Sequence, residues 1–233
     1  MKSNRNENDF PGLLGVLGGM GPAATLDFLD KLLKLTNAET DQEQIPTITY
    51  NNCMIPDRNE AYLRGGESPV PELIRSARVL ENAGVDLIAM PCNTAHIWFD
   101  SLVESTSVEF LNMPGITADC IPDGASVGII STTPVKLSGL YASKLAERGV
   151  VVKYGKDQDE IMKAIYLVKS GDLKDAKRIF MEQIDLLESE GVDHILAGCT
   201  EVPVVVSEDD LNSRLIDPME CLALECIRKF GKK

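Results

Sequence analysis

The chain has 233 residues, enough for one large or two small domains with a sizeable core. Its hydrophobic content of 44% and charged content of 25% are ordinary for a globular protein, and no apolar run approaches the 18 residues of a membrane span. The net charge of −13 argues against nucleic-acid binding through a basic face. It also means that specific Arg or Lys side chains would have to hold an anionic substrate.

The N-terminal residues and the cysteines indicate the compartment. The first ten residues, MKSNRNENDF, lack the apolar core of a signal peptide, and we expect residues 1–10 to form a disordered tail. Six cysteines without an export signal are typical of free thiols in a reducing environment. We therefore expect a cytoplasmic protein.

Strand and helix patterns alternate through the first half of the chain. Strands are expected at 13–19, 45–52, 85–90 and 108–113, and helices at 22–36, 71–84 and 94–104. Leu26, Leu29, Leu32 and Leu33 should form the inner face of the first helix. The polar connection 53–69 contains Pro and Gly, and a loop of this length is usually functional or mobile.

The same alternation restarts in the second half. Strands are expected at 125–132, 150–155, 192–198 and 214–218, and helices at 159–171, 172–191 and 219–230. Strands that alternate with helices form parallel sheets. The fold class is therefore α/β.

An internal repeat divides the chain. AGVDLIAMPCNTAH at 83–96 aligns with EGVDHILAGCTEVP at 190–203, which places Cys92 over Cys199 at an offset of 107 (199 − 92 = 107). The repeat predicts two similar lobes, each a parallel sheet flanked by helices and related by a pseudo-two-fold, with the active site between them. Residues 11–116 with 209–233 should form the N-terminal lobe, and 117–208 the second.

Both repeats end in a cysteine. The ligand sites of parallel α/β sheets lie beyond the carboxyl ends of the strands, so Cys92 and Cys199 should face one cleft. A single free cysteine is more often a packing residue, and Cys53, Cys120, Cys221 and Cys226 are interpreted in that way. Two cysteines at equivalent strand ends favour a functional pair. A helix N-terminus could lower the pKa of each thiol.

Two opposed thiols suit one reaction. One thiolate removes a proton from a carbon and the opposite thiol returns a proton to the other face, which inverts a stereocentre without a cofactor or metal. Each sulfur would lie roughly 3–3.5 Å from the carbon, so the two would be about 7 Å apart. The carbanion would need its carboxylate neutralised by Arg, Lys or backbone N–H groups.

Several motifs resemble the aspartate/glutamate racemase family, most closely its aspartate-racemase branch. They are GGMGPAAT (18–25), IPDR (55–58), MPCNTAH (90–96), AGCTE (197–201) and IDP (216–218), and the likeness runs from about residue 13 to 228. The resemblance implies two α/β lobes, a cysteine pair as proton donor and acceptor, no pyridoxal phosphate or metal, and a homodimer. The implied substrate is a small dicarboxylic amino acid.

The resemblance also assigns residues. Cys92 and Cys199 become the catalytic pair, while Arg58 and Lys169 resemble the basic residues that hold the side-chain carboxylate. The remaining expected substrate-binding residues are Met20, Asn93, Thr94, Ala95, Thr132, Thr200 and Glu201. Glu201 is interpreted as a supporting group rather than a base. His96, four residues after Cys92, is either structural or a support for the site.

Alternatives remain at this point. Gly19-Met20-Gly21 begins a weak match to the glycine-rich fingerprint of dinucleotide-binding proteins. However, Asn51-Asn52 stand where that fingerprint requires an acidic residue. Hydantoin racemases, maleate isomerases and malonate decarboxylases share the family resemblance, and a non-catalytic amino-acid-binding protein is a third option. Glutamate racemases carry Asp-Ser where this chain has Gly19-Met20, which favours aspartate or a broader specificity over glutamate alone.

Overall fold

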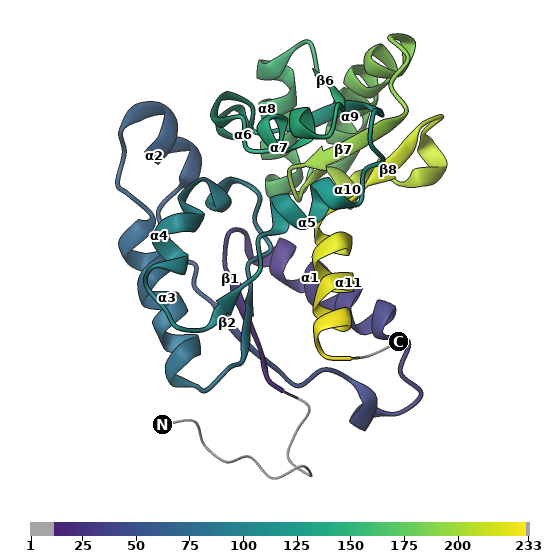
Figure 1. The fold of residues 1–233 in the computed structure, drawn as a ribbon. Coiled ribbons are helices and arrows are strands. Elements are labelled where there is room, and N and C mark those ends of the chain that lie inside the picture. The colour runs from purple at the N-terminus through teal and green to yellow at the C-terminus, as the bar shows by residue number, and fades with distance from the viewer. Residues whose placement is uncertain (1–11, 232–233) are drawn as a thin grey trace.

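The computed structural model describes residues 12–231, so the expected tail at 1–10 lies outside the described residues. Two lobes stack on each other, one above the other in Figure 1. Each is built on a four-stranded parallel sheet. The predicted two-lobe α/β class is therefore confirmed.

The first sheet has the strand order β2-β1-β3-β4. Its strands are β1 (Leu14–Gly18), β2 (Thr47–Asn51), β3 (Leu87–Ala89) and β4 (Glu109–Phe110). The helices and 3-10 turns of this part are α1 (Pro22–Thr36), η1 (Asp41–Glu43), α2 (Arg58–Arg64), α3 (Val70–Asn82), η2 (Thr94–Trp98) and α4 (Phe99–Val103). The helix α5 (Met113–Asp119) leads to the second lobe.

The second sheet repeats this arrangement in the order β6-β5-β7-β8. Its strands are β5 (Ser126–Ser131), β6 (Val151–Tyr154), β7 (His194–Gly198) and β8 (Arg214–Ile216). Its helices and turns are α6 (Thr133–Ser138), α7 (Ala142–Glu147), α8 (Gln158–Ser170), α9 (Leu173–Ser189), α10 (Val202–Val205) and η3 (Glu208–Asp210). The closing helix is α11 (Pro218–Lys229), drawn in yellow in Figure 1.

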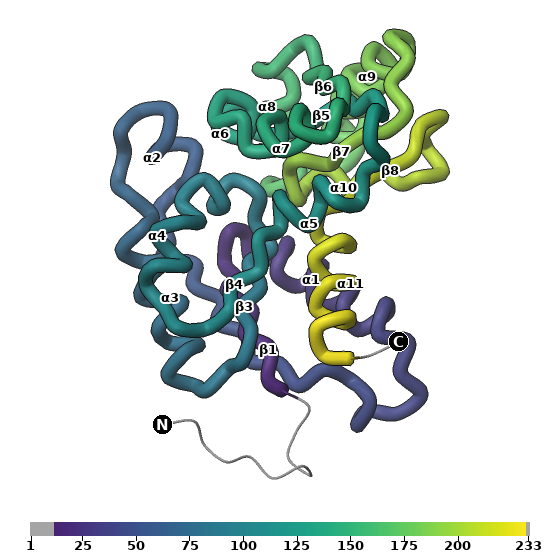
Figure 2. The backbone as a smooth tube through the Cα atoms, in the orientation of Figure 1, coloured from purple at the N-terminus to yellow at the C-terminus, as the bar shows by residue number. Residues whose placement is uncertain are grey.

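Apolar clusters cover both faces of each sheet. In the first lobe, one cluster joins β1 to α1 and α11, and another joins β1 and β3 to α3. In the second lobe, α8 and α9 pack on one face of the sheet, and α7 packs on the other. The tube in Figure 2 shows β1, β3 and β4 side by side beneath the second lobe. The space between the lobes thus borders the ends of both sheets.

The sequence repeat has a local structural cause. Gly84 and Gly191 have φ of 81° and 77°, a left-handed conformation that suits glycine and ends α3 and α9. Two residues later, the Asp86 carboxylate accepts from Leu13 N–H at 2.8 Å, and the Asp193 carboxylate accepts from Ser126 N–H at 2.9 Å. Each aspartate therefore ties the start of β3 or β7 to the strand beside it.

The inner face of α1 differs from the prediction. Leu26 and Leu33 are 67% and 55% exposed, whereas Phe28 is fully buried and Leu32 nearly so. Residues four apart share a helix face, and Phe28 and Leu32 belong to the face that packs on β1. Leu26 and Leu33 project from other faces, so the expected leucine stripe is wrong at these two positions.

Three element boundaries also differ. The expected strand 108–113 shortens to β4, because Met113 already begins α5. The expected helix 94–104 divides into η2 and α4. The connection 53–69 contains a helix, α2, whose start Asp57 caps by accepting from Asn59 and Glu60 N–H.

The lobe division is corrected at β8. This strand pairs with β7 (Leu215 beside Ile195), so residues 214–216 belong to the second sheet and not to the N-terminal lobe as expected. The chain returns to the first lobe through α11, in which Met219 and Leu222 pack in the apolar cluster around β1. The expected boundary at 116/117 falls inside α5, which packs on α11.

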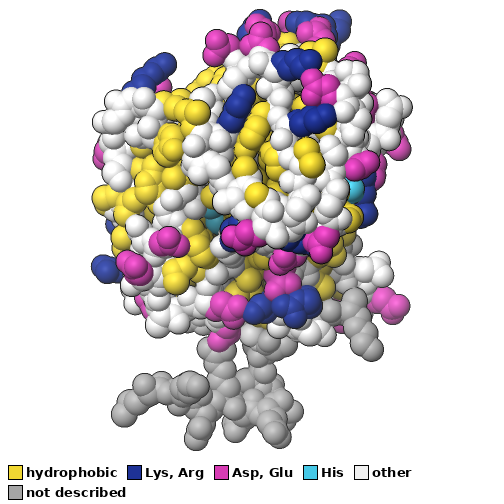
Figure 3. All heavy atoms as spheres, turned by 45° about the horizontal axis from the view of Figure 1, so that its top comes forward, with side chains coloured by type: hydrophobic (Ala, Val, Ile, Leu, Met, Phe, Trp, Pro, Cys, Tyr) yellow, Lys and Arg dark blue, Asp and Glu magenta, His cyan; other side chains and the backbone are white. Residues whose placement is uncertain are grey.

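The surface charges and the lengths of the helices indicate which kinds of partner the protein could bind. Acidic and basic side chains are interspersed on the face drawn in Figure 3, with hydrophobic side chains between them. That face presents no continuous basic surface among the residues described. Within 12–231, no helix combines the length and apolar character that a membrane crossing requires.

Replacement of Gly128 by Ala should destabilise the fold. A Cβ there would lie 2.8 Å from Leu187 Cδ1 and 3.0 Å from Ile195 Cδ1, where α9 packs on β5. Such overpacking costs about 1–3 kcal/mol, measurable as a lower free energy of unfolding in urea. Gly115→Ala is the control, since its Cβ would meet Asn112 Cγ at an ordinary 3.4 Å. Equal stability of the two variants would contradict the packing argument.

Candidate active site

A polar pocket lies between the lobes. Residues from both lobes line it: Met20, Asp57, Arg58, Asn59, Cys92, Asn93, Thr94, Thr132, Lys169, Cys199, Thr200 and Glu201. The space left free in it is small, about 20 Å³. The polar groups are therefore packed closely around a small space.

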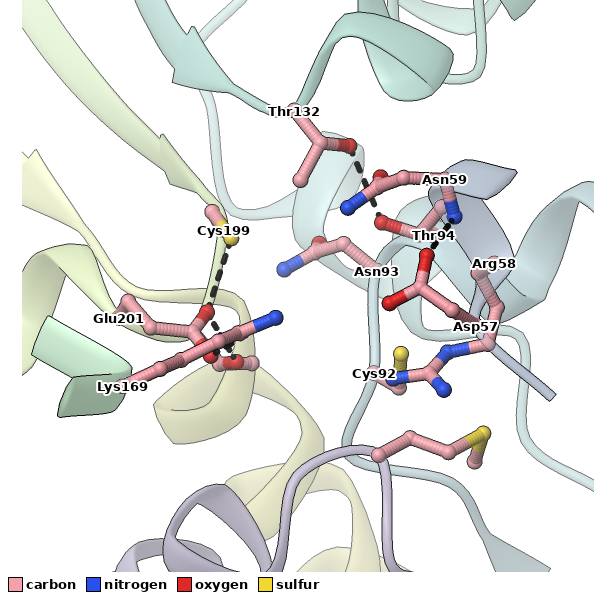
Figure 4. Close-up of a pocket in the computed structure, with 12 residues that line it drawn as sticks. Asp57, Arg58, Asn59, Cys92, Asn93, Thr94, Thr132, Lys169, Cys199 and Glu201 are labelled. Atoms are coloured by element: carbon pink, nitrogen blue, oxygen red, sulfur yellow. Dashed lines mark hydrogen bonds and ion pairs between the residues drawn. The ribbon is translucent and has the colours of Figure 1, made fainter. Parts of the chain in front are cut away.

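The two predicted cysteines face this pocket from opposite sides. Cys92 follows β3 of the first lobe and Cys199 follows β7 of the second, as Figure 4 shows. Both are buried, with exposed fractions of 5% and 6%. The repeat thus places equivalent thiols in one site, as the sequence predicted.

Cys199 is held as a thiol. Its Sγ–H donates to Glu201 Oε2 at 2.9 Å, and Thr200 Oγ1 donates to the same oxygen at 3.1 Å. Burial raises the pKa of Cys199 well above its ordinary value, and the nearby Glu201 carboxylate raises it further. The following helix, α10, has only four residues. The expectation that a helix N-terminus lowers the pKa of this thiol is therefore wrong.

Each lobe supplies a cationic side chain. Arg58 is the first residue of α2, and its Nη1 donates to Pro56 O at 3.1 Å. Lys169, in the last turn of α8, has its Nζ 3.9 Å from Glu201 Oε1 and 5.5 Å from the centre of the Tyr166 ring. Figure 4 shows the two cations entering the pocket from opposite sides. Such a pair suits an anionic ligand with two charged groups.

Hydrogen bonds between the lobes border the pocket. Thr94 Oγ1 and Thr132 Oγ1 are 3.0 Å apart, and Tyr141 OH donates to Asn93 Oδ1. Asn59 Nδ2 donates to Tyr166 OH at 3.4 Å. These contacts join η2 and α2 of the first lobe to the second lobe, so they set the spacing of the two half-sites.

Three buried polar atoms of the pocket residues have no hydrogen-bond partner within the described structure. They are Arg58 Nε, Asn59 Oδ1 and Asn93 Nδ2. Leaving such groups unpaired is costly, and native proteins rarely do so without a functional reason. Two donors and one acceptor match a ligand that carries both carboxylate and ammonium groups.

The remaining predicted residues fall into two groups. Met20, Thr94, Thr132, Thr200 and Glu201 line the pocket. Ala95 does not, because its side chain is fully buried in the apolar cluster with Ile88 and Leu102.

The sequence reasoning missed Asp57 and Asn59. The sequence D-R-N-E carries a helix-start signal, since Asp57 stands three residues before Glu60. That signal would have placed Asp57, Arg58 and Asn59 together at a helix N-terminus. The unpaired Asn59 Oδ1, by contrast, is a property of the folded pocket.

His96 holds the backbone of the loop that carries Cys92 through hydrogen bonds. Its Nδ1 lies 2.7 Å from Cys92 O, and its Nε2 accepts from Met113 N–H at 3.3 Å. Because the Met113 amide can only donate, Nδ1 carries the hydrogen and donates to Cys92 O. Burial lowers the pKa of His96 to about 4, so the ring is neutral at pH 7. His96 therefore supports the site structurally.

The glycine-containing loop before α1 packs against α1 and the end of β2. Gly19 N–H donates to Thr25 Oγ1 at 3.0 Å, and a Cβ on Gly19 would lie 2.3 Å from Asn52 O. This close approach to the end of β2 gives the glycine a structural use. No cluster of three or more His, Cys, Asp or Glu suited to a metal ion occurs within the part of the chain that the structure describes.

The fold and pocket define a class of two-lobed α/β proteins with paired cysteines in a polar interlobe site. The model of the Asp/Glu/Hydantoin racemase family matches residues 17–226. The chain belongs to this family.

Similar proteins agree with this assignment. The structure of Picrophilus torridus aspartate racemase is 40% identical, with a TM-score of 0.89 and 95% of each chain covered. An aspartate racemase homologue from Pyrococcus horikoshii OT3 is 25% identical, with a TM-score of 0.76, covering 94% of this chain and 99% of that one. The broad specificity amino-acid racemase RacX of Bacillus subtilis (strain 168) is 28% identical over 94% of this chain and 98% of its own.

Glu201→Gln should lower the pKa of Cys199. The substitution removes the negative charge beside the thiol, so the thiolate should form at a pH lower by about one unit or more. The measurement is the pH dependence of iodoacetamide alkylation at Cys199, resolved by peptide mass spectrometry. Exposed Cys53 is the internal reference. An unchanged or higher midpoint would show that the carboxylate does not control this thiol.

His96→Gln should weaken the acid sensitivity of the fold. The folded-state pKa of His96, about 4, lies below the ordinary 6.5, so the stability it contributes is present above pH 6.5 and is lost as pH falls toward 4. Between pH 7 and pH 5 the wild type should lose about 2 kcal/mol more than the variant. Urea unfolding at both pH values measures this difference, and an identical loss in both proteins would refute it.

Proposed function

We propose that the protein is a cofactor-independent amino-acid racemase that interconverts L- and D-aspartate by two-base proton transfer between Cys92 and Cys199. The observation that carries the proposal is the placement of these two thiols, one on each lobe, in a single pocket with two cationic side chains. Inversion at one carbon needs groups on opposite faces, and the lobes supply them.

The pocket chemistry favours an acidic amino acid. Arg58 and Lys169 would hold the side-chain carboxylate, whereas Asn93 Nδ2 and the Thr94 and Thr200 hydroxyls would bind the α-carboxylate. Neutralising the α-carboxylate stabilises the carbanion that forms at Cα. The unpaired Asn59 Oδ1 is then an acceptor for the α-ammonium group. Every unpaired atom in the pocket receives a partner in this arrangement.

The hydrogen bond of Cys199 indicates its role in the reaction. Cys199 is a thiol bonded to Glu201, so it is the proton donor in the first half of a turnover. Cys92 would remove the α-proton from the opposite face. After inversion the proton has moved between the sulfurs, so a reaction from the other enantiomer runs in the reverse direction. Neither step consumes a cofactor.

The lobes would move apart to admit the substrate, because hydrogen bonds between them border a pocket with little free space. The interlobe hydrogen bonds of Thr94 with Thr132 and of Asn59 with Tyr166 would have to open. They would close again over the substrate, which excludes water from the carbanion. We further propose that the protein works in the cytoplasm as a homodimer.

Proton NMR in D₂O tests the function directly. L-aspartate and L-glutamate would be incubated separately with metal-free protein and reductant, with optical rotation followed in parallel. We expect loss of the α-proton signal together with loss of rotation for aspartate. The similarity to a broad specificity racemase makes glutamate and neutral amino acids the next substrates to compare.

Cysteine variants test the mechanism. Cys92→Ser and Cys199→Ser should each reduce racemisation by at least about 100-fold, because serine is a much weaker acid than cysteine. Cys226→Ser is the control, a buried cysteine in the core around α11 and outside the pocket. Near-wild-type turnover in either pocket variant would eliminate the two-base assignment.

The same experiment separates the alternatives. Proton exchange without loss of rotation would mean that a single base acts. Absence of exchange with every amino acid, combined with aspartate protection of Cys92 and Cys199 from alkylation, would identify a binding protein. Absence of both would point to another chemistry of the family, such as that of hydantoin racemases.

A further inference from the structure

A second pair of cysteines lies outside the interlobe pocket. Cys120 is the exposed residue that ends α5, and Cys221 is buried in the first turn of α11. The two helices pack directly against each other, and Figure 1 shows the end of α5 beside the start of α11.

The two sulfur-bearing residues share the walls of two surface cavities. One cavity, of about 440 Å³, is bordered by Ile116 and Arg228, and the other, of about 130 Å³, by Arg214 and Glu220. Cys120 and Cys221 line both. A small molecule in either cavity would therefore reach the pair from the surface.

The two thiols also differ in acidity. A hydrogen bond from the Cys221 thiol lowers the pKa of Cys120 to about 7, and Arg214 adds a smaller favourable charge. The pKa of Cys221 is raised, chiefly by its interaction with the Cys120 sulfur and by burial. Around neutral pH, Cys120 is therefore the more readily ionised thiol, which attacks first, and Cys221 is the thiol that follows.

We propose that Cys120 and Cys221 are a redox-active pair that a peroxide converts into a disulfide between α5 and α11. The Cys120 thiolate attacks the peroxide, forming an S–O bond while the O–O bond breaks, and the released hydroxide takes a proton to become water. Cys221 then loses its proton and attacks the sulfenic sulfur, which expels the second oxygen as water. The two thiols lose two electrons and hydrogen peroxide gains them.

The position of the pair gives the disulfide a mechanical role. The chain passes from the first sheet to the second through α5, and it returns from β8 to the first lobe through α11. A bond from Cys120 to Cys221 would join these two crossings. Cys221 also belongs to the apolar cluster that contains Tyr141, whose hydroxyl donates to Asn93 in the pocket.

The test is thiol mapping of the wild-type protein. Protein treated with hydrogen peroxide at pH 7 would be alkylated, digested without reduction and analysed by mass spectrometry. Cleavage after Glu104 and Glu225 separates these cysteines from Cys92 and Cys226. We expect a linked Cys120–Cys221 peptide, two hydrogens lighter than the separate peptides and absent after dithiothreitol. Before oxidation, Cys120 should react with iodoacetamide several-fold faster than exposed Cys53.

Variants define the order of the steps. In Cys221→Ser, Cys120 should accumulate sulfenic and sulfinic acid and form no link, whereas in Cys120→Ser the residue Cys221 should stay reduced. Cys53→Ser is the matched control and should form the link normally. Recovery of Cys120 and Cys221 on separate alkylated peptides from peroxide-treated wild type would overturn the proposal. This readout does not depend on racemase activity, so the two proposals fail independently.

Discussion

The proposed chemistry depends on the distance between two half-sites that belong to different lobes. Each lobe brings a cysteine to the carboxyl end of an interior strand, β3 or β7, and neither sulfur can act alone in an inversion. The spacing is set by the contacts between lobes, above all Thr94 with Thr132 and Asn93 with Tyr141. A displacement of about 1 Å can cost about 100-fold in rate, so these polar contacts matter as much as the thiols.

The internal repeat produces this geometry, and the likeness between the lobes extends only as far as the two cysteines. Before each cysteine, the glycine cap and the aspartate clamp are equivalent in the two lobes, so the two strand ends are built in the same way. After the cysteine the lobes differ. The first places His96 behind the Cys92 carbonyl, whereas the second places Glu201 directly on the Cys199 thiol. Equivalent scaffolds therefore hold the two thiols in different surroundings.

The sequence predicted features whose causes are local. Apolar periodicity indicated the strands and helices, and the repeat indicated that Cys92 and Cys199 occupy equivalent strand ends. Prediction from the sequence failed where the structure depends on contacts between residues that are distant along the chain. The edge position of β8 depends on pairing with β7, and the exposure of Leu26 and Leu33 depends on which face of α1 packs on β1. The raised pKa of Cys199 likewise comes chiefly from burial in the folded chain, which the local sequence does not indicate.

The charge balance of the pocket shows how an acidic protein could bind an amino acid with two carboxylate groups. Despite the net charge of −13, Arg58 and Lys169 converge on one small space, and Lys169 lies near Glu201 Oε1. A substrate carboxylate would compete with Glu201 for that ammonium group. As Lys169 turned toward the substrate, Glu201 would keep the Cys199 thiol bonded to its other oxygen. Substrate binding would then strengthen the hold of Glu201 on the proton donor, because a cation beside Glu201 weakens it as an acceptor.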